Sequence, residues 1–130
     1  MKNILNTYYG KKLSLRKVST DLFSDVDNVS VACVKINNLK DAVIENISFI
    51  SINEGESNAQ VLLPKEYLKD DGKYYVILIN HPGGCMSPSP QDMSLYRSYK
   101  RITENCDVVI VSKDKKVFLS VNQMLKDILF

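Results

Sequence analysis

Residues 74–92 read YYVILINHPGGCMSPSPQD, an apolar run that passes directly into a stretch rich in glycine, serine and proline. The run over 74–80 has the pattern of a strand that is buried on both faces. From Pro90 onward, apolar residues recur at helical spacing and predict a helix over 90–105. A loop that leaves a central strand and enters a helix is a favoured place for chemistry in α/β sheets.

The segments on either side of this stretch complete an α/β pattern. Their order predicts a central mixed β-sheet flanked by helices, folded as a single domain over 1–130. In chain order, the other expected elements are a helix over 14–24, a β-hairpin of 29–36 and 42–52 turned at Asn37-Asn38, a short helix over 65–70 that Asp71-Gly72 ends, strands over 107–112 and 117–121, and a terminal helix over 122–129.

Composition narrows the function classes. The chain has 130 residues, 45% of them hydrophobic, and a net charge of +2, which is too small to argue for nucleic acid or an acidic membrane surface as partner. The densest basic group consists of Lys11, Lys12, Arg16 and Lys17. This group is most simply a solvated helix face, with a binding patch as the alternative.

No apolar run has the length of a membrane span and no secretory pattern is seen, so we expect neither feature.

The three cysteines are Cys33, Cys85 and Cys106. Their number is odd and no two have the Cys-x-x-Cys spacing, so a disulfide framework is not expected and a reducing cytoplasm fits. Cys33 and Cys106 stand beside apolar residues and are expected in the core. Cys85 stands in the loop, where it is either a thiol without a role or a metal ligand.

The loop offers two polar features. Ser89 and Asp92 bracket Pro90 as a capping box would, with Ser89 at the N-cap and Asp92 near the positive end of the helix dipole. This capping role needs no catalytic function. His81, the single histidine of the chain, is expected on the face of Ile79 because residues two apart in a strand point the same way. It is either a structural side chain or a group that reaches a cleft.

Taken together, HPGG and SPSPQD resemble the loop of the RadC-like branch of the JAMM (JAB/MPN) metalloprotease fold, which follows the pattern H-x-H-x7-S-x2-D. Seven residues separate His81 from Ser89, and two separate Ser89 from Asp92. The flanking segments 49–53, 58–70 and 106–120 are also similar, so the resemblance covers about 27–121. The matching loop positions are Asn80, His81, Pro82, Gly84, Pro88, Ser89 and Asp92.

The resemblance implies a JAMM/MPN-like, cytidine-deaminase-like three-layer sandwich. In that family two histidines and the aspartate hold a zinc ion with a water as fourth ligand, and a glutamate from an earlier strand is the general base. This chain departs from the pattern at two places. The first histidine falls on Ile79, which cannot bind a metal, and the glutamate falls near Asn28 or Val29, with Asp25 and Asp27 as the nearest carboxylates.

A catalytic zinc site needs three protein ligands and an open position for water. With His81 and Asp92 alone, we expect no cofactor and a non-catalytic binding or accessory module, of the kind that accompanies mobile elements and phage, with a protein partner. The alternative is a zinc-dependent hydrolase of peptide or isopeptide bonds that uses His81, Cys85 and Asp92 as ligands, with Ser89 in its catalytic set. Nucleic acid stays an alternative partner through the family resemblance alone.

Overall fold

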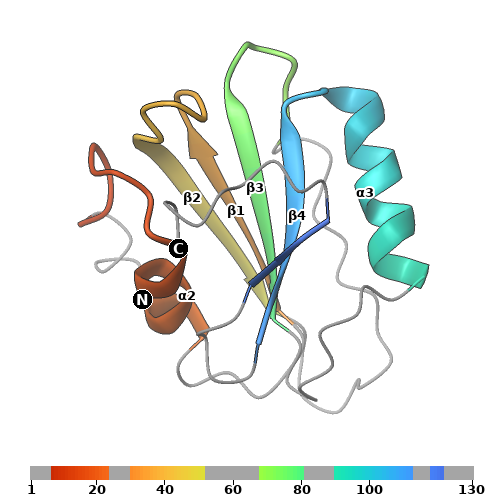
Figure 1. Cartoon of the computed structure of the whole chain (residues 1–130), viewed down its shortest axis with the longest axis horizontal. Helices are drawn as coiled ribbons and strands as arrows, with labels where there is room; N and C mark the ends of the chain where they lie inside the picture. Colours follow the sequence, from red (N-terminus) through yellow and green to blue (C-terminus); the bar gives the residue numbers. More distant parts are fainter. Residues whose placement is uncertain (1–6, 24–29, 52–67, 81–89, 113–117, 122–130) are drawn as a thin grey trace.

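The computed structural model describes residues 7–23, 30–51, 68–80, 90–112 and 118–121, and Figure 1 shows their arrangement. Within these residues, the chain forms a five-stranded mixed sheet and two helices, so the predicted α/β class is confirmed. The elements are α2 (Leu15–Phe23), β1 (Ser30–Ile36), β2 (Ile44–Ser51), β3 (Tyr74–Asn80), α3 (Pro90–Ile102), β4 (Cys106–Val111) and β5 (Phe118–Ser120).

Strand β3 lies at the centre of the sheet, as its apolar sequence predicts. The strand order is β2-β1-β3-β4-β5, in which only the β3–β4 pair is parallel. Every residue of β3 and of β4 is buried. Continuous apolar runs are typical of such doubly covered strands, because neither face of the strand meets water.

A helix covers each face of the sheet. The odd-numbered side chains of β3, such as Ile77, pack in one core cluster with Tyr99 of α3. The even-numbered side chains, such as Val76, pack in a second cluster with Leu22 of α2. The predicted sheet flanked by helices is therefore confirmed, and its two cores are separated by the period of two along each strand. No described helix is long and apolar enough to cross a bilayer.

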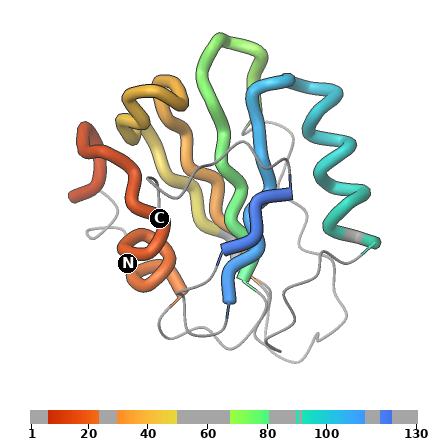
Figure 2. The backbone as a smooth tube through the Cα atoms, viewed as in Figure 1, coloured from red at the N-terminus to blue at the C-terminus, as the bar shows by residue number. Residues whose placement is uncertain are grey.

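Helix α3 runs antiparallel to β3 and β4 (Figure 1). Its amino end consequently lies at the same end of the sheet as the carboxyl ends of these two strands. On the other side of the molecule, the segment 7–13 runs alongside the start of β2 (Figure 2). Backbone hydrogen bonds hold it there, from Gly10 N to Ile44 O at 2.8 Å and from Leu13 N to Ala42 O at 2.7 Å.

Helix α3 and strand β2 are each shorter than predicted, for identifiable reasons. Helix α3 ends at Ile102 because the Asn105 N–H takes the Thr103 hydroxyl as acceptor and the Asn105 carbonyl accepts from the sheet. Strand β2 begins at Ile44 rather than at 42. The hairpin loop extends to Ala42, whose φ of 53° is left-handed, and the Asn37 side chain closes this loop by accepting from the Val43 N–H.

The short helix predicted over 65–70 is wrong in its described part, because Leu68 to Asp70 are not helical. Leu68 is buried in the cluster beneath α3, and Gly72 adopts a positive φ of 80° two residues before β3 begins. The packing of Leu68 and the turn at Gly72 therefore override the local helical signal. The remainder of this segment, and the helix predicted over 122–129, lie outside the described residues.

Candidate functional site

Four buried polar side chains gather at the carboxyl end of β3. Ser30 of β1 lies directly opposite Asn80 of β3, and Ser112 follows the β4 residue that pairs with Asn80. Asp92 lies in the first turn of α3, which starts at this end (Figure 1). All four are at most 8% exposed. This end of the sheet is where open α/β sheets place their ligand sites.

The sheet divides these groups between its two faces. Ile79 belongs to the cluster beneath α3. Its neighbour Asn80 must point to the opposite face, with Leu78 and the α2 cluster, because side chains alternate along a strand. Ser30 shares the face of Asn80 across the strand pair. Ser112 follows Val111 of the α2 cluster, so the same alternation places it on the α3 side with Ile79 and Asp92. Of the four polar side chains, only Asp92 is of a type that commonly binds zinc.

Ile79 stands where the resemblance places a zinc-binding histidine. It is 4% exposed and pairs directly with Val31 of β1, which is also buried beneath α3. Neither side chain has a nitrogen, oxygen or sulfur atom. Ile79 is thus an apolar core residue and cannot serve as a metal ligand.

Asp92 lies at the place predicted for it. Pro90 is the first residue of α3, Asp92 is in its first turn, and the Asp92 residue is 7% exposed. A carboxylate here is favoured by the positive end of the helix dipole. Asp92 can therefore serve the helix, a ligand, or both.

The other predicted site residues lie outside the described residues. These are His81, Cys85 and Ser89, together with Asn28 and Val29 where the general base was sought and the nearby Asp25 and Asp27. In the part of the chain that is described, no three His, Cys, Asp or Glu side chains come close enough to hold a metal ion.

The two described cysteines are not poised to bind a metal ion. Cys33 and Cys106 are buried thiols that form no disulfide in the described residues, and their burial was predicted. Burial raises the pKa of the Cys33 thiol to about 12 and that of Cys106 to about 11. Both stay protonated at neutral pH, whereas zinc and electrophiles react with the thiolate.

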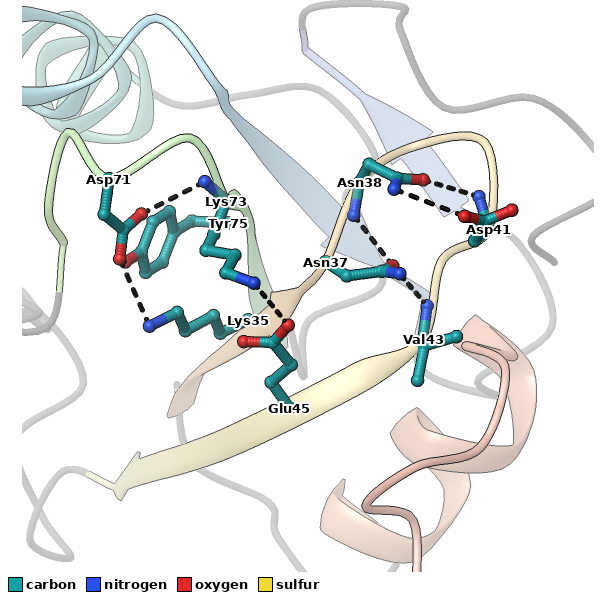
Figure 3. Close-up of polar contacts among 9 residues, drawn as sticks. All are labelled: Lys35, Asn37, Asn38, Asp41, Val43, Glu45, Asp71, Lys73 and Tyr75. Atoms are coloured by element: carbon teal, nitrogen blue, oxygen red, sulfur yellow. Dashed lines mark hydrogen bonds and ion pairs between the residues drawn. The ribbon is translucent and has the colours of Figure 1, made fainter.

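A charged network that the sequence did not reveal ties together the opposite, amino end of β3 (Figure 3). The Asp71 carboxylate accepts from the Tyr75 hydroxyl at 2.9 Å and from the Lys73 N–H at 3.1 Å, and it pairs with Lys35 at 3.2 Å. Lys73 in turn pairs with Glu45 at 2.8 Å. The sequence signal that could have revealed this network is Lys35, a charged residue in a strand of mostly apolar residues. Its pairing with Asp71 depends on the strand register, which places Lys35 opposite Tyr75.

The network shifts the ionisation of its members. Partial burial alone would raise the pKa of Asp71, but hydrogen bonds from Lys73, Tyr75 and Lys35 lower it below its usual value. Burial, and then the neighbouring Asp71, raise the pKa of Tyr75 to about 12. Tyr75 therefore remains a hydrogen-bond donor and Asp71 an acceptor over the whole neutral range.

A groove of about 430 Å³ opens near this amino end of β3. It lies far along the sheet from Asn80, because its residues come from the β1–β2 loop, the start of β3 and the end of α3. Its lining mixes amide, aliphatic and charged groups, and its Lys100 already donates to the Glu104 carbonyl at 2.6 Å. The lining residues are Asn38, Leu39, Gly72, Tyr74, Lys100, Glu104 and Asn105.

The chain is similar to a UPF0758 protein of Finegoldia magna, with 31% identity over 132 aligned positions. The similarity includes 89% of this chain and 57% of the relative, so the chain spans little more than half of the relative's length. No protein-family model matches the chain.

Proposed function

We propose that this chain is a RadC-like JAB/MPN domain with an incomplete zinc site, and that it acts as a non-catalytic binding or accessory module. Ile79 carries this proposal. It occupies the expected place of a zinc-binding histidine, at the carboxyl end of the central strand, and it is buried against Val31. An aliphatic side chain in a packed core can neither bind a metal nor leave room for one.

Two observations support the family assignment. The similarity to a UPF0758 protein supports it, because this name is used for RadC-like proteins. The sheet also agrees with it, since α3, which has Asp92 in its first turn, begins at the end of the sheet where the central strand β3 stops. The JAB/MPN fold itself is part of the proposal.

The zinc ligand set of the family is incomplete in this chain. A catalytic zinc site needs three protein ligands, and Ile79 stands at the position of one of them. The substituted set of His81, Cys85 and Asp92 is therefore the competing proposal, and it depends on Cys85.

The alternation of side chains along β1 bears on where we propose that a general base would have to stand. The odd-numbered residues of β1, Val31 and Cys33, face the α3 side together with Ile79. Position 29 has this parity and position 28 does not. Any attempt to rebuild activity should therefore place glutamate at Val29, with Asn28→Glu as the matched control.

The partner of such a module is proposed to be a protein. The net charge of +2 does not by itself draw the whole chain to a polyanion. A domain that keeps the fold and loses the metal can still present the loop and the start of α3 to another chain. An accessory role in a mobile element or phage belongs to the same proposal.

The test is the zinc content of the purified wild-type chain, followed by zinc titration at neutral pH. We expect far less than one zinc per chain and no change in Cys85→Ser. The matched control is Cys33→Ala, which removes a buried thiol that stays protonated. Near-stoichiometric zinc that is lost in Cys85→Ser and kept in Cys33→Ala would replace this proposal with the zinc hydrolase.

A further inference from the structure

We propose that the solvent face of α2 and the turn before it bind single-stranded nucleic acid. This surface, called the α2 basic face, consists of Tyr9, Lys11, Lys12, Arg16 and Lys17, all of them exposed. It lies on the α2 side of the sheet, opposite the layer that contains Ile79 and Asp92. The inference is thus independent of the function proposed above.

Among the described residues, none of the four cations of the α2 basic face pairs with an acidic side chain, in contrast to the paired Lys35, Lys73 and Lys100. The first turn of α2 contains no acidic residue. Positive charge therefore accumulates at one place on a chain whose net charge is only +2.

The nearest acidic residue of α2 is already engaged. The Asp21 carboxylate accepts a hydrogen bond from the Tyr8 hydroxyl, which also lies 3.2 Å from the Lys17 carbonyl oxygen. Tyr8 thereby fastens the turn before α2 to the helix, and the Asp21 carboxylate forms no ion pair with any of the four cations in the described residues. Phosphate oxygens are the acceptors that unpaired lysine and arginine side chains bind in nucleic acids.

An aromatic side chain stands beside these cations. Tyr9 is 38% exposed. Among the described residues, Leu119 is the only other large hydrophobic side chain that is exposed. Its hydroxyl donates to the Asn46 side chain on β2 at 3.0 Å, which fixes one edge of the ring. A fixed, exposed ring next to cations is the arrangement on which unpaired bases stack while their phosphates are neutralised.

The backbone beneath this surface is held in place before any ligand arrives. Gly10 N donates to Ile44 O, Ile44 N donates to Lys11 O at 2.9 Å, and Lys11 N donates to Tyr8 O at 3.1 Å. Tyr9, Lys11 and Lys12 are therefore presented from a turn that β2 fixes, which reduces the entropy lost on binding. Single-stranded nucleic acid fits better than an acidic peptide or a duplex, because only unpaired bases would use Tyr9.

The experiment measures fluorescence anisotropy of a short labelled oligothymidylate against the full chain over a range of salt concentrations. Contacts with four phosphates predict a slope of log K against log[salt] of roughly −3. Lys11→Gln with Lys12→Gln should weaken binding by about tenfold or more at low salt and reduce the slope by about 1.4. The matched control, Arg97→Gln with Arg101→Gln, removes two exposed cations from α3 and should bind as wild type does.

The ring is tested separately, with unfolding midpoints confirming that each variant is folded. Tyr9→Leu should lose at least about fivefold in affinity, whereas Tyr9→Phe, which loses only the hydroxyl, should retain binding. Any of three outcomes would overturn the inference. The α3 control could lose as much affinity as the lysine variant, Tyr9→Leu could bind as wild type does, or a labelled polyglutamate or DNA duplex could bind as tightly as the oligothymidylate.

Discussion

The two ends of β3 are built from different kinds of polar group. At the amino end, the partly accessible charged groups of Asp71 and Lys35 pair with each other, and the hydroxyl of the buried Tyr75 donates to Asp71 (Figure 3). At the carboxyl end, the polar side chains of Ser30, Asn80, Asp92 and Ser112 are buried, and the described residues there include no lysine or arginine.

The difference indicates separate roles for the two ends. A satisfied network at the margin of the sheet fixes the geometry of β1 and β3 and contributes stability. At the carboxyl end, polar side chains are buried at the end of the sheet where open α/β sheets place their ligand sites. We therefore assign structure to the amino end and propose recognition for the carboxyl end.

The largest expected effect concerns Ile79 at the carboxyl end. Ile79→Ala should lower the free energy of unfolding by about 3 kcal/mol, because a buried aliphatic side chain is replaced by a cavity. Urea denaturation measures this change, and Leu119→Ala, at an exposed position of β5, serves as the control with a change below about 0.5 kcal/mol. A loss below about 1 kcal/mol for Ile79→Ala would mean that this side chain faces an open cleft.

The next effect concerns the amino end and depends on pH. Because the pKa of Asp71 is lowered in the folded protein, its stabilisation is present at neutral pH and is lost as the pH falls through the folded-state pKa. Asp71→Asn should cost roughly 1 kcal/mol at neutral pH and should flatten the loss of stability on acidification below about pH 4. Parallel stability–pH curves for the two proteins would refute a structural role for this network.

A similar cost is expected at the start of α3. Ser89→Ala should lower the free energy of unfolding by about 1 kcal/mol if Ser89 caps the helix that Pro90 begins. Ser89→Asp is the matched variant that keeps a capping oxygen, and thermal unfolding compares the three proteins. If Ser89→Ala leaves the midpoint unchanged, then Ser89 serves the loop rather than the helix.

The smallest effect belongs to the exposed pair of Lys73 and Glu45. Both side chains are more than 30% exposed, so Glu45→Gln should cost less than about 0.5 kcal/mol. The difference from wild type should vanish at high salt, because salt screens surface charges. A cost that persists at high salt would show that this pair belongs to the Asp71 network rather than to the surface.

The sequence predicted the sheet well because its strands are decided by burial. The apolar run of β3 predicted a central strand with the bounds that the structure has. The period of two also predicted that Ile77 and Ile79 share one face. Local patterns succeeded wherever a single face or stripe of side chains enters the core.

Other features depend on contacts between distant residues and could not be predicted. The pairing of Lys35 with Asp71 joins β1 to the residues before β3, and no local pattern contains it. The helix predicted over 65–70 is wrong in its described part, 68–70, because Leu68 packs into a core that the local sequence does not show. At the candidate site the sequence indicated the missing ligand at Ile79, whereas the direct contact of Ile79 with Val31 required the strand register.

The most direct test of the account is the zinc affinity of Ile79→His, measured by competition with a chromophoric chelator at neutral pH. We predict a gain of at least about tenfold over wild type, since a direct ligand should matter no less than the residues that orient one. Ile79→Asn is the matched control, because it introduces a polar group of similar burial that binds zinc poorly. Added zinc should also raise the unfolding midpoint of Ile79→His, because a ligand that binds only the folded state stabilises it. If Ile79→His gains no affinity over wild type and Ile79→Asn, then Ile79 does not occupy a ligand position and the proposed zinc-site ancestry of this domain is wrong.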